Sequence, residues 1–216
     1  MFDTNNLLNF DNNYPCKNDA LVIPQVFSFY KAPVKNVYPS KQLTLLETYK
    51  LIKSNRYQRQ TEMLRGITDL KEARRFKASN FDYVTYSGTF TSRKNDGLIQ
   101  HSGLMVLDFD KLDDVMALKK ALIVDEYFEP DMLFVSPSGN GLKLVTTIDL
   151  NLGSHLDWFM AIADYVRTTY QLEIDASGKD VSRAAFLPFD ENVYINPIYF
   201  SDSFSQPINT DNHEII

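Results

Sequence analysis

The chain has 216 residues, of which 44% are hydrophobic and 23% are charged, and its formal net charge is −6. These proportions are ordinary for a globular protein, and the length suffices for one sizeable core or for two small lobes that share one. No apolar stretch approaches the roughly 18 residues of a membrane span, and residues 1–18 lack the pattern of a signal peptide. The single cysteine, Cys16, excludes an intrachain disulfide and a thiol-rich zinc site. We therefore expect a cytoplasmic protein with no membrane partner.

Charge is unevenly distributed along the chain. Residues 31–94 contain 14 Lys and Arg against 5 Asp and Glu, a net of +9, whereas the remainder contains 8 against 23, a net of −15. A basic part beside an acidic part suits a protein that holds phosphate groups in one place and cations in another. Solvated helix surfaces that share a sign by chance are the alternative interpretation.

The first half of the chain reads as strand, helices, strand. Hydrophobic periodicity predicts strands at 22–30 and 83–86, and helices at 43–52, 58–65 and 69–77. The third helix begins near Asp69 and ends with cationic residues, as the helix dipole favours. We predict that this basic half, residues 20–97, belongs to one domain over 20–200, between a mobile arm at 1–19 and a frayed tail at 201–216.

The second half, residues 98–200, contains the clearest strand of the sequence, at 103–109. This strand is almost continuously apolar, so we expect it to be central and buried on both faces. The other predicted elements are helices at 115–124 and 156–170 and strands at 132–135, 142–148, 172–175 and 184–189. Their order predicts an α+β fold with a mixed or antiparallel sheet and helices on one face. His101 is expected to be a hydrogen-bonded structural residue, and Trp158 a core residue.

Asp108 and Asp110 stand at the end of the central strand. Residues i and i+2 of a strand point to the same face, so the two carboxylates should project together. Hard divalent cations such as Mg²⁺ or Mn²⁺ prefer such a pair of oxygen ligands. An acidic loop that follows a strand is the other interpretation, since Asp113 and Asp114 come next.

The residues Ser136-Pro-Ser-Gly-Asn-Gly-Leu-Lys143 connect two predicted strands. Backbone N–H groups of a glycine-bearing turn can approach an anion closely, and Ser138 and Lys143 would add a hydroxyl and a positive charge. This combination suits a triphosphate, although the spacing differs from a Walker A loop. An ordinary hairpin turn is the alternative.

A third polar cluster runs from Asp175 to Arg183. Asp175 follows a short apolar stretch and could complete a metal site, and Arg183 could hold a phosphate with its guanidinium fork. An Asp180–Arg183 ion pair in an acidic turn is the simpler interpretation. Taken together, the carboxylate pair, the turn with its lysine and the third carboxylate form the arrangement typical of two-metal nucleotidyl transfer.

With these motifs in view, the chain resembles the archaeo-eukaryotic primase superfamily, in particular the VirE N-terminal-like, primase-polymerase-related domains carried by bacterial mobile elements. The resemblance runs from about Val26 to Asn196. It is carried by the segments Val84–Phe90 with Arg93, His101–Leu104, Leu107–Asp110, Ser136–Lys143 and Asp180–Arg183.

The resemblance implies an RRM-like catalytic half joined to an N-terminal α/β half, and a nucleotidyltransferase that uses Mg²⁺ or Mn²⁺. The implied catalytic and metal-binding residues are Asp108, Asp110 and Asp175, with Asp180 as the rival of Asp175. The implied nucleotide-binding residues are Ser136, Ser138, Gly139, Gly141, Lys143 and Arg183. The implied partners are nucleoside triphosphates, single-stranded DNA or a primed template, and a helicase domain or protein. The basic half would bind the template through Arg74, Arg75, Lys77 and Arg93.

One residue departs from the superfamily pattern. Where its second motif has a histidine, this chain has Lys143. Lysine also binds phosphate, but as a different donor. The departure supports an alternative function, a single-stranded DNA-binding or replication-initiation module without catalysis. A metal-dependent nuclease that uses the same carboxylates is a further alternative.

Overall fold

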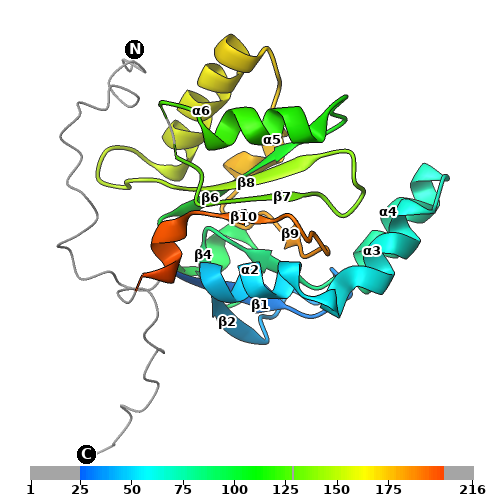
Figure 1. Cartoon of the computed structure of the whole chain (residues 1–216). Coiled ribbons are helices and arrows are strands. Elements are labelled where there is room, and N and C mark those ends of the chain that lie inside the picture. The colour runs from blue at the N-terminus through cyan, green and yellow to red at the C-terminus, as the bar shows by residue number, and fades with distance from the viewer. Residues whose placement is uncertain (1–24, 128, 202–216) are drawn as a thin grey trace, which may run out of the picture.

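The computed structural model describes residues 25–127 and 129–201 (Figure 1). The arm predicted at 1–19, the first three residues of the strand predicted at 22–30, and the tail from 202 onward lie outside these ranges. The described chain is α+β, and all of its described strand pairs are antiparallel, which confirms the coarse fold prediction. None of the described helices is long and apolar enough to cross a membrane.

Two four-stranded sheets and a two-stranded hairpin form the β structure of the described residues. The first sheet has the order β2 (Lys41–Thr44), β1 (Val26–Tyr30), β3 (Tyr83–Thr85) and β9 (Ala185–Phe186). The second has the order β10 (Tyr194–Ile195), β7 (Met132–Val135), β8 (Leu142–Thr147) and β6 (Leu104–Phe109). The hairpin consists of β4 (Gly88–Phe90) and β5 (Leu98–His101).

Four of the five described α-helices begin after a residue whose side chain caps them, and α3 begins without such a cap. The α-helices are α2 (Leu45–Lys53), α3 (Gln58–Arg65), α4 (Leu70–Asn80), α5 (Val115–Ile123) and α6 (His155–Tyr170). Thr44 and Ser154 form capping boxes at α2 and α6, and Asp69 and Asp114 cap α4 and α5. Short 3₁₀ turns are η1 (Asn55–Tyr57), η2 (Asn95–Gly97), η3 (Ala176–Lys179) and η4 (Pro197–Phe200).

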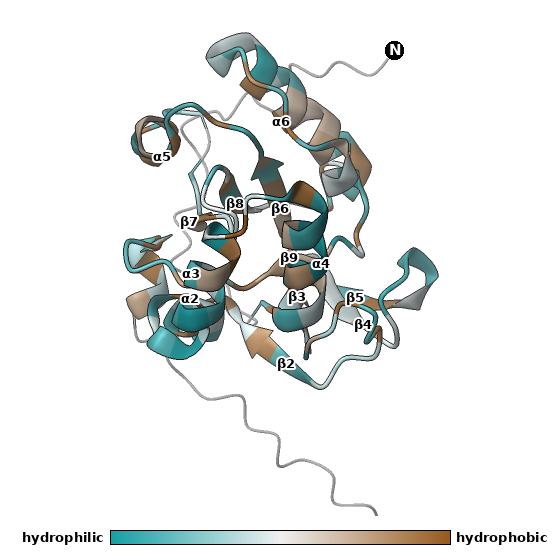
Figure 2. Ribbon diagram, turned by 90° about the vertical axis from the view of Figure 1, so that its right-hand side faces the viewer, coloured by the Kyte–Doolittle hydropathy of each residue, from teal (hydrophilic) through white to brown (hydrophobic). Residues whose placement is uncertain are grey.

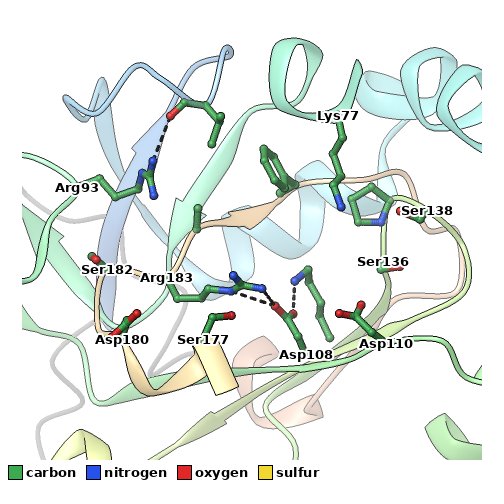
Figure 3. A pocket seen from close by; sticks show the side chains of 15 residues that line it. Lys77, Arg93, Asp108, Asp110, Ser136, Ser138, Ser177, Asp180, Ser182 and Arg183 are labelled. Atoms are coloured by element: carbon green, nitrogen blue, oxygen red, sulfur yellow. Dashed lines mark hydrogen bonds and ion pairs between the residues drawn. The ribbon is translucent and has the colours of Figure 1, made fainter. Parts of the chain in front are cut away.

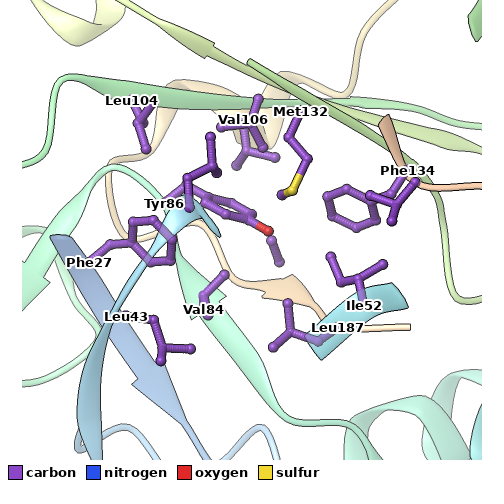
Figure 4. Close-up of a cluster of buried hydrophobic side chains, with 14 of the residues drawn as sticks. Phe27, Leu43, Ile52, Val84, Tyr86, Leu104, Val106, Met132, Phe134 and Leu187 are labelled. Carbon is purple, nitrogen blue, oxygen red and sulfur yellow. The ribbon is translucent and has the colours of Figure 1, made fainter. Parts of the chain in front are cut away.

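The second sheet is the middle layer of the molecule. Helices α5 and α6 cover one face of it, and α2 lies on the opposite side, as two views at right angles show (Figures 1 and 2). Along β6, Met105 and Leu107 pack toward the helices, whereas Leu104 and Val106 pack toward the first sheet (Figure 4). The prediction that this strand is buried on both faces is therefore confirmed, but the prediction that it is central is wrong, because β6 pairs only with β8 and forms an edge of the second sheet. The period of two along β6 also directs Asp108 to the face that meets the first sheet.

Three predicted elements differ from the structure, and one observed hairpin is absent from the predictions. The helix expected from residue 43 begins at Leu45, because Leu43 pairs with Phe27 in β2. The strand expected at 172–175 is wrong, because Asp175 instead caps η3 with its side chain. The strand expected at 184–189 is only β9, and the hairpin β4–β5 was not predicted.

Candidate functional site

A cavity of about 410 Å³ lies at the C-terminal ends of β6 and β7 and the N-terminal end of β8, beside α4 and the η3 segment (Figure 3). Four cationic and three anionic side chains line it, together with several serines. The lining residues are Val34, Lys77, Arg93, Asp108, Asp110, Ser136, Pro137, Ser138, Lys143, Ser177, Asp180, Ser182, Arg183, Ala184 and Phe186. Most of the residues predicted from the sequence for metal and nucleotide binding therefore share one cavity.

Asp108 is at the centre of a buried ion-pair network. It is 4% exposed, and the antiparallel register of β6 and β8 places Lys143 directly opposite it. The Lys143 ammonium donates to Asp108 Oδ1, and the Arg183 guanidinium donates to Oδ2 from Nη2 at 2.6 Å and from Nε at 3.2 Å. Burial alone would raise the pKa of Asp108, but Lys143 and Arg183 together hold it below its usual range. Both oxygens of this carboxylate are thus engaged by cations.

Asp110 stands just after β6 and is exposed at the cavity. Its carboxylate makes no hydrogen bond or ion pair with any described residue. Gly141 lies close beneath it: a Cβ on this glycine would be 3.3 Å from Asp110 Oδ1 and 3.2 Å from Ser136 Oγ. The glycine therefore leaves room for a carboxylate and a hydroxyl at one corner of the cavity.

The turn between β7 and β8 is held by a residue that the sequence analysis missed. Arg65, at the end of α3, donates to the carbonyl oxygens of Pro137 at 3.3 Å and Ser136 at 3.4 Å. Gly139 has a φ of +85°, and a Cβ there would be 3.1 Å from Arg65 Nε. The turn thus needs glycine both for its left-handed backbone and for the arginine that lies against it.

The two candidates for a third carboxylate occupy different places. Asp175 accepts from Arg183 Nη2 at 2.8 Å, and its backbone N–H donates to Asp108 O. It is not among the residues that line the cavity, whereas Asp180 is. The pKa of Asp175 is lowered although burial opposes this, because Ser177 and Arg183 stabilise its charge. Asp175 is therefore positioned to orient Arg183.

The predicted template-binding residues separate into two groups. Lys77 and Arg93 line the cavity, where Lys77 lies over the Phe186 ring at 5.7 Å, and Arg93 donates to Tyr83 Oη and to Val34 O. The pKa of Lys77 is lowered, first by burial and then by Lys143. Arg74 and Arg75 are exposed on α4 and do not line the cavity.

The arrangement contains no complete set of metal ligands from side chains. Within 25–127 and 129–201, no three His, Cys, Asp or Glu side chains are grouped so that they could hold a metal ion. Asp108 and Asp110 do offer hard oxygen ligands on one face, which fits Mg²⁺ or Mn²⁺ in donor chemistry. Such a site needs further oxygens from water or phosphate, and it needs Asp108 to release at least one of its cations.

His101 is a structural residue, as predicted, but its partner was missed. His101 Nδ1 accepts from the Gly103 N–H at 3.0 Å, and His101 Nε2 is 3.1 Å from His155 Nδ1. His155 Nε2 in turn is 3.1 Å from the carbonyl oxygen of Gly178. Two neutral imidazoles, each with its proton on Nε2, satisfy all of these contacts. The pair links β5 through α6 to the η3 segment that lines the cavity.

Comparison with known proteins gives one match. The sequence model of the BT4734-like N-terminal domain matches residues 75–195. No curated protein and no solved structure matches the chain. The matched segment is more than half of the 216 residues and includes every cavity-lining residue except Val34. The chain therefore belongs to the family of BT4734-like N-terminal domains.

Proposed function

We propose that this domain is a primase-polymerase-like nucleotidyltransferase that binds a nucleoside triphosphate in the cavity and adds nucleotides to a DNA or RNA strand. The observation that carries the proposal is the convergence of three separate motifs on one cavity: Asp108 and Asp110 at the end of β6, the serines and Lys143 around the β7–β8 turn, and Arg183 after η3. The RRM-like architecture and the cytoplasmic replication of a mobile element belong to the same proposal.

The triphosphate would be bound by charge and by hydroxyl donors. Lys143, Arg183 and Lys77 bring three cations to the cavity, and Ser136 and Ser138 line the same space. Cations and hydroxyls around a confined anion hold its phosphates in a fixed orientation, which lowers the barrier to in-line transfer. Gly139 and Gly141 would keep the turn close to the ligand.

A divalent cation, Mg²⁺ or Mn²⁺, would be held by Asp108 and Asp110. When bound, it would activate the attacking hydroxyl and neutralise the departing pyrophosphate. Asp175 would then orient Arg183, and Asp180 would be the carboxylate available at the cavity wall.

The nucleic acid would lie along α4 and enter the cavity from that side. Arg74 and Arg75 are exposed on this helix, and Lys77 follows them at the cavity. Exposed Arg and Lys neutralise backbone phosphates in a salt-dependent way and leave the bases unread. We propose single-stranded DNA or a primed template as the partner, with a helicase to supply it.

The test is incorporation of labelled nucleotides on primed and unprimed single-stranded templates with Mn²⁺ or Mg²⁺. Asp110→Asn is the most informative variant, because Asp110 has no partner among the described residues and its loss should leave the fold intact. We expect wild-type protein and the exposed-site control Asp113→Asn to extend, and Asp110→Asn and Asp108→Asn/Asp110→Asn to lose extension by at least a hundredfold. Extension that persists in both variants would refute the assignment.

A binding module without catalysis is the second candidate, and a specific observation favours it. Both oxygens of Asp108 are engaged by Lys143 and Arg183, so the carboxylate is committed to ion pairs. This candidate predicts salt-sensitive DNA binding that is unchanged in Asp110→Asn, with no extension by any variant. A shortened strand in the same assay would instead indicate a nuclease.

A further inference from the structure

The ammonium of Lys143 occupies the side of Asp108 that a metal ion would need. Lys143 is 8% exposed, and it faces Asp108 across the β6–β8 ladder. Its donation to Oδ1, with that of Arg183 to Oδ2, leaves neither oxygen free of a cation. A second cation at this carboxylate therefore has to displace an existing one.

The surrounding charges also oppose a metal ion in the absence of an anion. Lys77 makes no ion pair with any residue in the part of the chain that the structure describes, and it points toward Asp108 from α4 (Figure 3). The cavity lining carries four cations, Lys77, Arg93, Lys143 and Arg183, against the three carboxylates of Asp108, Asp110 and Asp180, and Asp175 pairs with Arg183 from outside the lining. Two more positive charges in this partly enclosed space would be uncompensated, and uncompensated charge is costly where water is excluded.

An unfilled donor in the same cavity indicates what would compensate the charge. Ser177 Oγ is buried and has no hydrogen bond of ordinary geometry, although the hydroxyl helps to lower the pKa of the Asp175 carboxyl, and Ser177 lines the cavity. Buried hydroxyls are usually hydrogen-bonded, so a weakly bonded hydroxyl beside four cations is suited to donate to an anion in the cavity. A phosphate group supplies acceptor oxygens and negative charge together.

From these observations we infer that Lys143 makes metal binding at Asp108 conditional on a phosphate ligand. The Lys143 ammonium stays paired with Asp108 until a phosphate attracts it, and only then can the Asp108 carboxylate bind a divalent cation. The inference deepens the proposed function and rests on it for the identity of the anion. It assigns to Lys143 a positioning role that a neutral side chain could not perform, since Lys143 supplies the ion pair at Oδ1 while Arg183 pairs with Oδ2. Reciprocity then requires that the metal strengthen phosphate binding by the same factor.

The experiment measures Mn²⁺ binding by the electron paramagnetic resonance signal of the free ion, with the full chain and no template or nucleotide. Inorganic phosphate is the anionic probe, because it binds Mn²⁺ weakly in solution, and protein-free titrations correct for that binding. The variants are Lys143→Met, which removes the charge and keeps much of the side-chain volume, and the control Lys120→Met, which removes an exposed lysine on α5.

We expect wild-type protein to bind Mn²⁺ at least tenfold more tightly with phosphate than without it. Lys143→Met should bind Mn²⁺ without phosphate at least tenfold more tightly than wild type, and phosphate should then add little. Lys120→Met should behave as wild type. The inference would be overturned if the Mn²⁺ affinity of wild type were the same with and without phosphate. It would also be overturned if Lys143→Met and wild type bound Mn²⁺ equally well without phosphate. If Lys143→Met does not fold, as a melting curve would show, the comparison of wild type with and without phosphate decides alone.

The outcome is independent of whether the domain extends a primer. A protein that shows the phosphate dependence but never incorporates a nucleotide would support the inference and contradict the proposed function. A protein that incorporates nucleotides, but whose Mn²⁺ affinity is the same with and without phosphate, would support the proposed function and contradict the inference.

Discussion

The histidine pair should make the folding stability depend on pH in a predictable direction. Burial, and then the neighbouring His155, lower the pKa of His101 from 6.5 to about 4, and burial also lowers the pKa of His155. The neutral ring of His101 is fixed by its contacts: protonation would place a proton on Nδ1, which already accepts from the Gly103 N–H. The folded chain thus binds fewer protons than the unfolded chain between pH 6.5 and 4. The contribution of His101 to the free energy of unfolding should therefore be fully present above pH 6.5 and should decrease as the pH falls toward 4.

The size of this contribution to stability follows from the pKa shift of His101. A difference of this size corresponds to about 3 kcal/mol at about 1.4 kcal/mol per pH unit. We discount it to about 2 kcal/mol because the His101 ring is only partly buried and solvent screens part of the effect. Asp180 lies near His155 and favours its charged form, which reduces the contribution of that second ring.

The assay is chemical denaturation at pH 7 and at pH 4.5 for wild type, His101→Gln and the control Gln100→Ala, which alters an exposed neighbour on β5. Glutamine retains hydrogen-bonding groups and does not titrate. We expect the stability lost between the two pH values to be about 2 kcal/mol smaller in His101→Gln than in wild type and in the control. The comparison between variants removes the contribution of the carboxylates, which titrate in all three proteins. Equal losses in wild type and His101→Gln would refute the reasoning.

Two further predictions concern the turn between β7 and β8. Arg65→Met removes the donors that hold the turn, so it should weaken triphosphate binding about tenfold in isothermal calorimetry with little change in melting temperature. The control Arg59→Met, on the same helix, should bind the triphosphate as wild type does. Equal affinities of Arg65→Met and wild type would contradict a positioning role for Arg65. Gly141→Ala should lower the free energy of unfolding by roughly 2 kcal/mol, because its Cβ would be 2.5 Å from the carbonyl oxygen of Phe109. Gly66→Ala, whose Cβ would meet ordinary contacts of 3.5 Å or more, should change stability by less than about 0.5 kcal/mol, so similar losses in both variants would disprove the steric argument.

The sequence was most informative where one pattern determined one element. The unbroken apolar run of β6 predicted a strand buried on both faces, and the apolar spacing over 156–170 predicted the longest described helix, which begins one residue earlier at His155. It was least informative for short strands whose partners are distant. Lys41–Thr44 is too polar to be recognised as β2, and it is a strand because β1 pairs with it. The short apolar run at 172–175 predicts a strand, yet Ile174 is buried against the core without ladder partners, and Asp175 caps a 3₁₀ turn.

For the site, the sequence indicated which side chains could bind a metal or a phosphate, but not that these side chains form ion pairs with one another. Asp108 and Lys143 were identified separately, as a metal ligand and as a phosphate donor, because each was interpreted within its own motif. Their ion pair depends on the register of β6 against β8, a long-range property that local patterns do not contain. The same holds for Arg183, which reaches Asp108 only because η3 returns the chain to the end of β6. Lys143 therefore does more than offer a phosphate donor. It places a fixed positive charge against Asp108, so under the proposed function metal binding and phosphate binding would not be independent of each other.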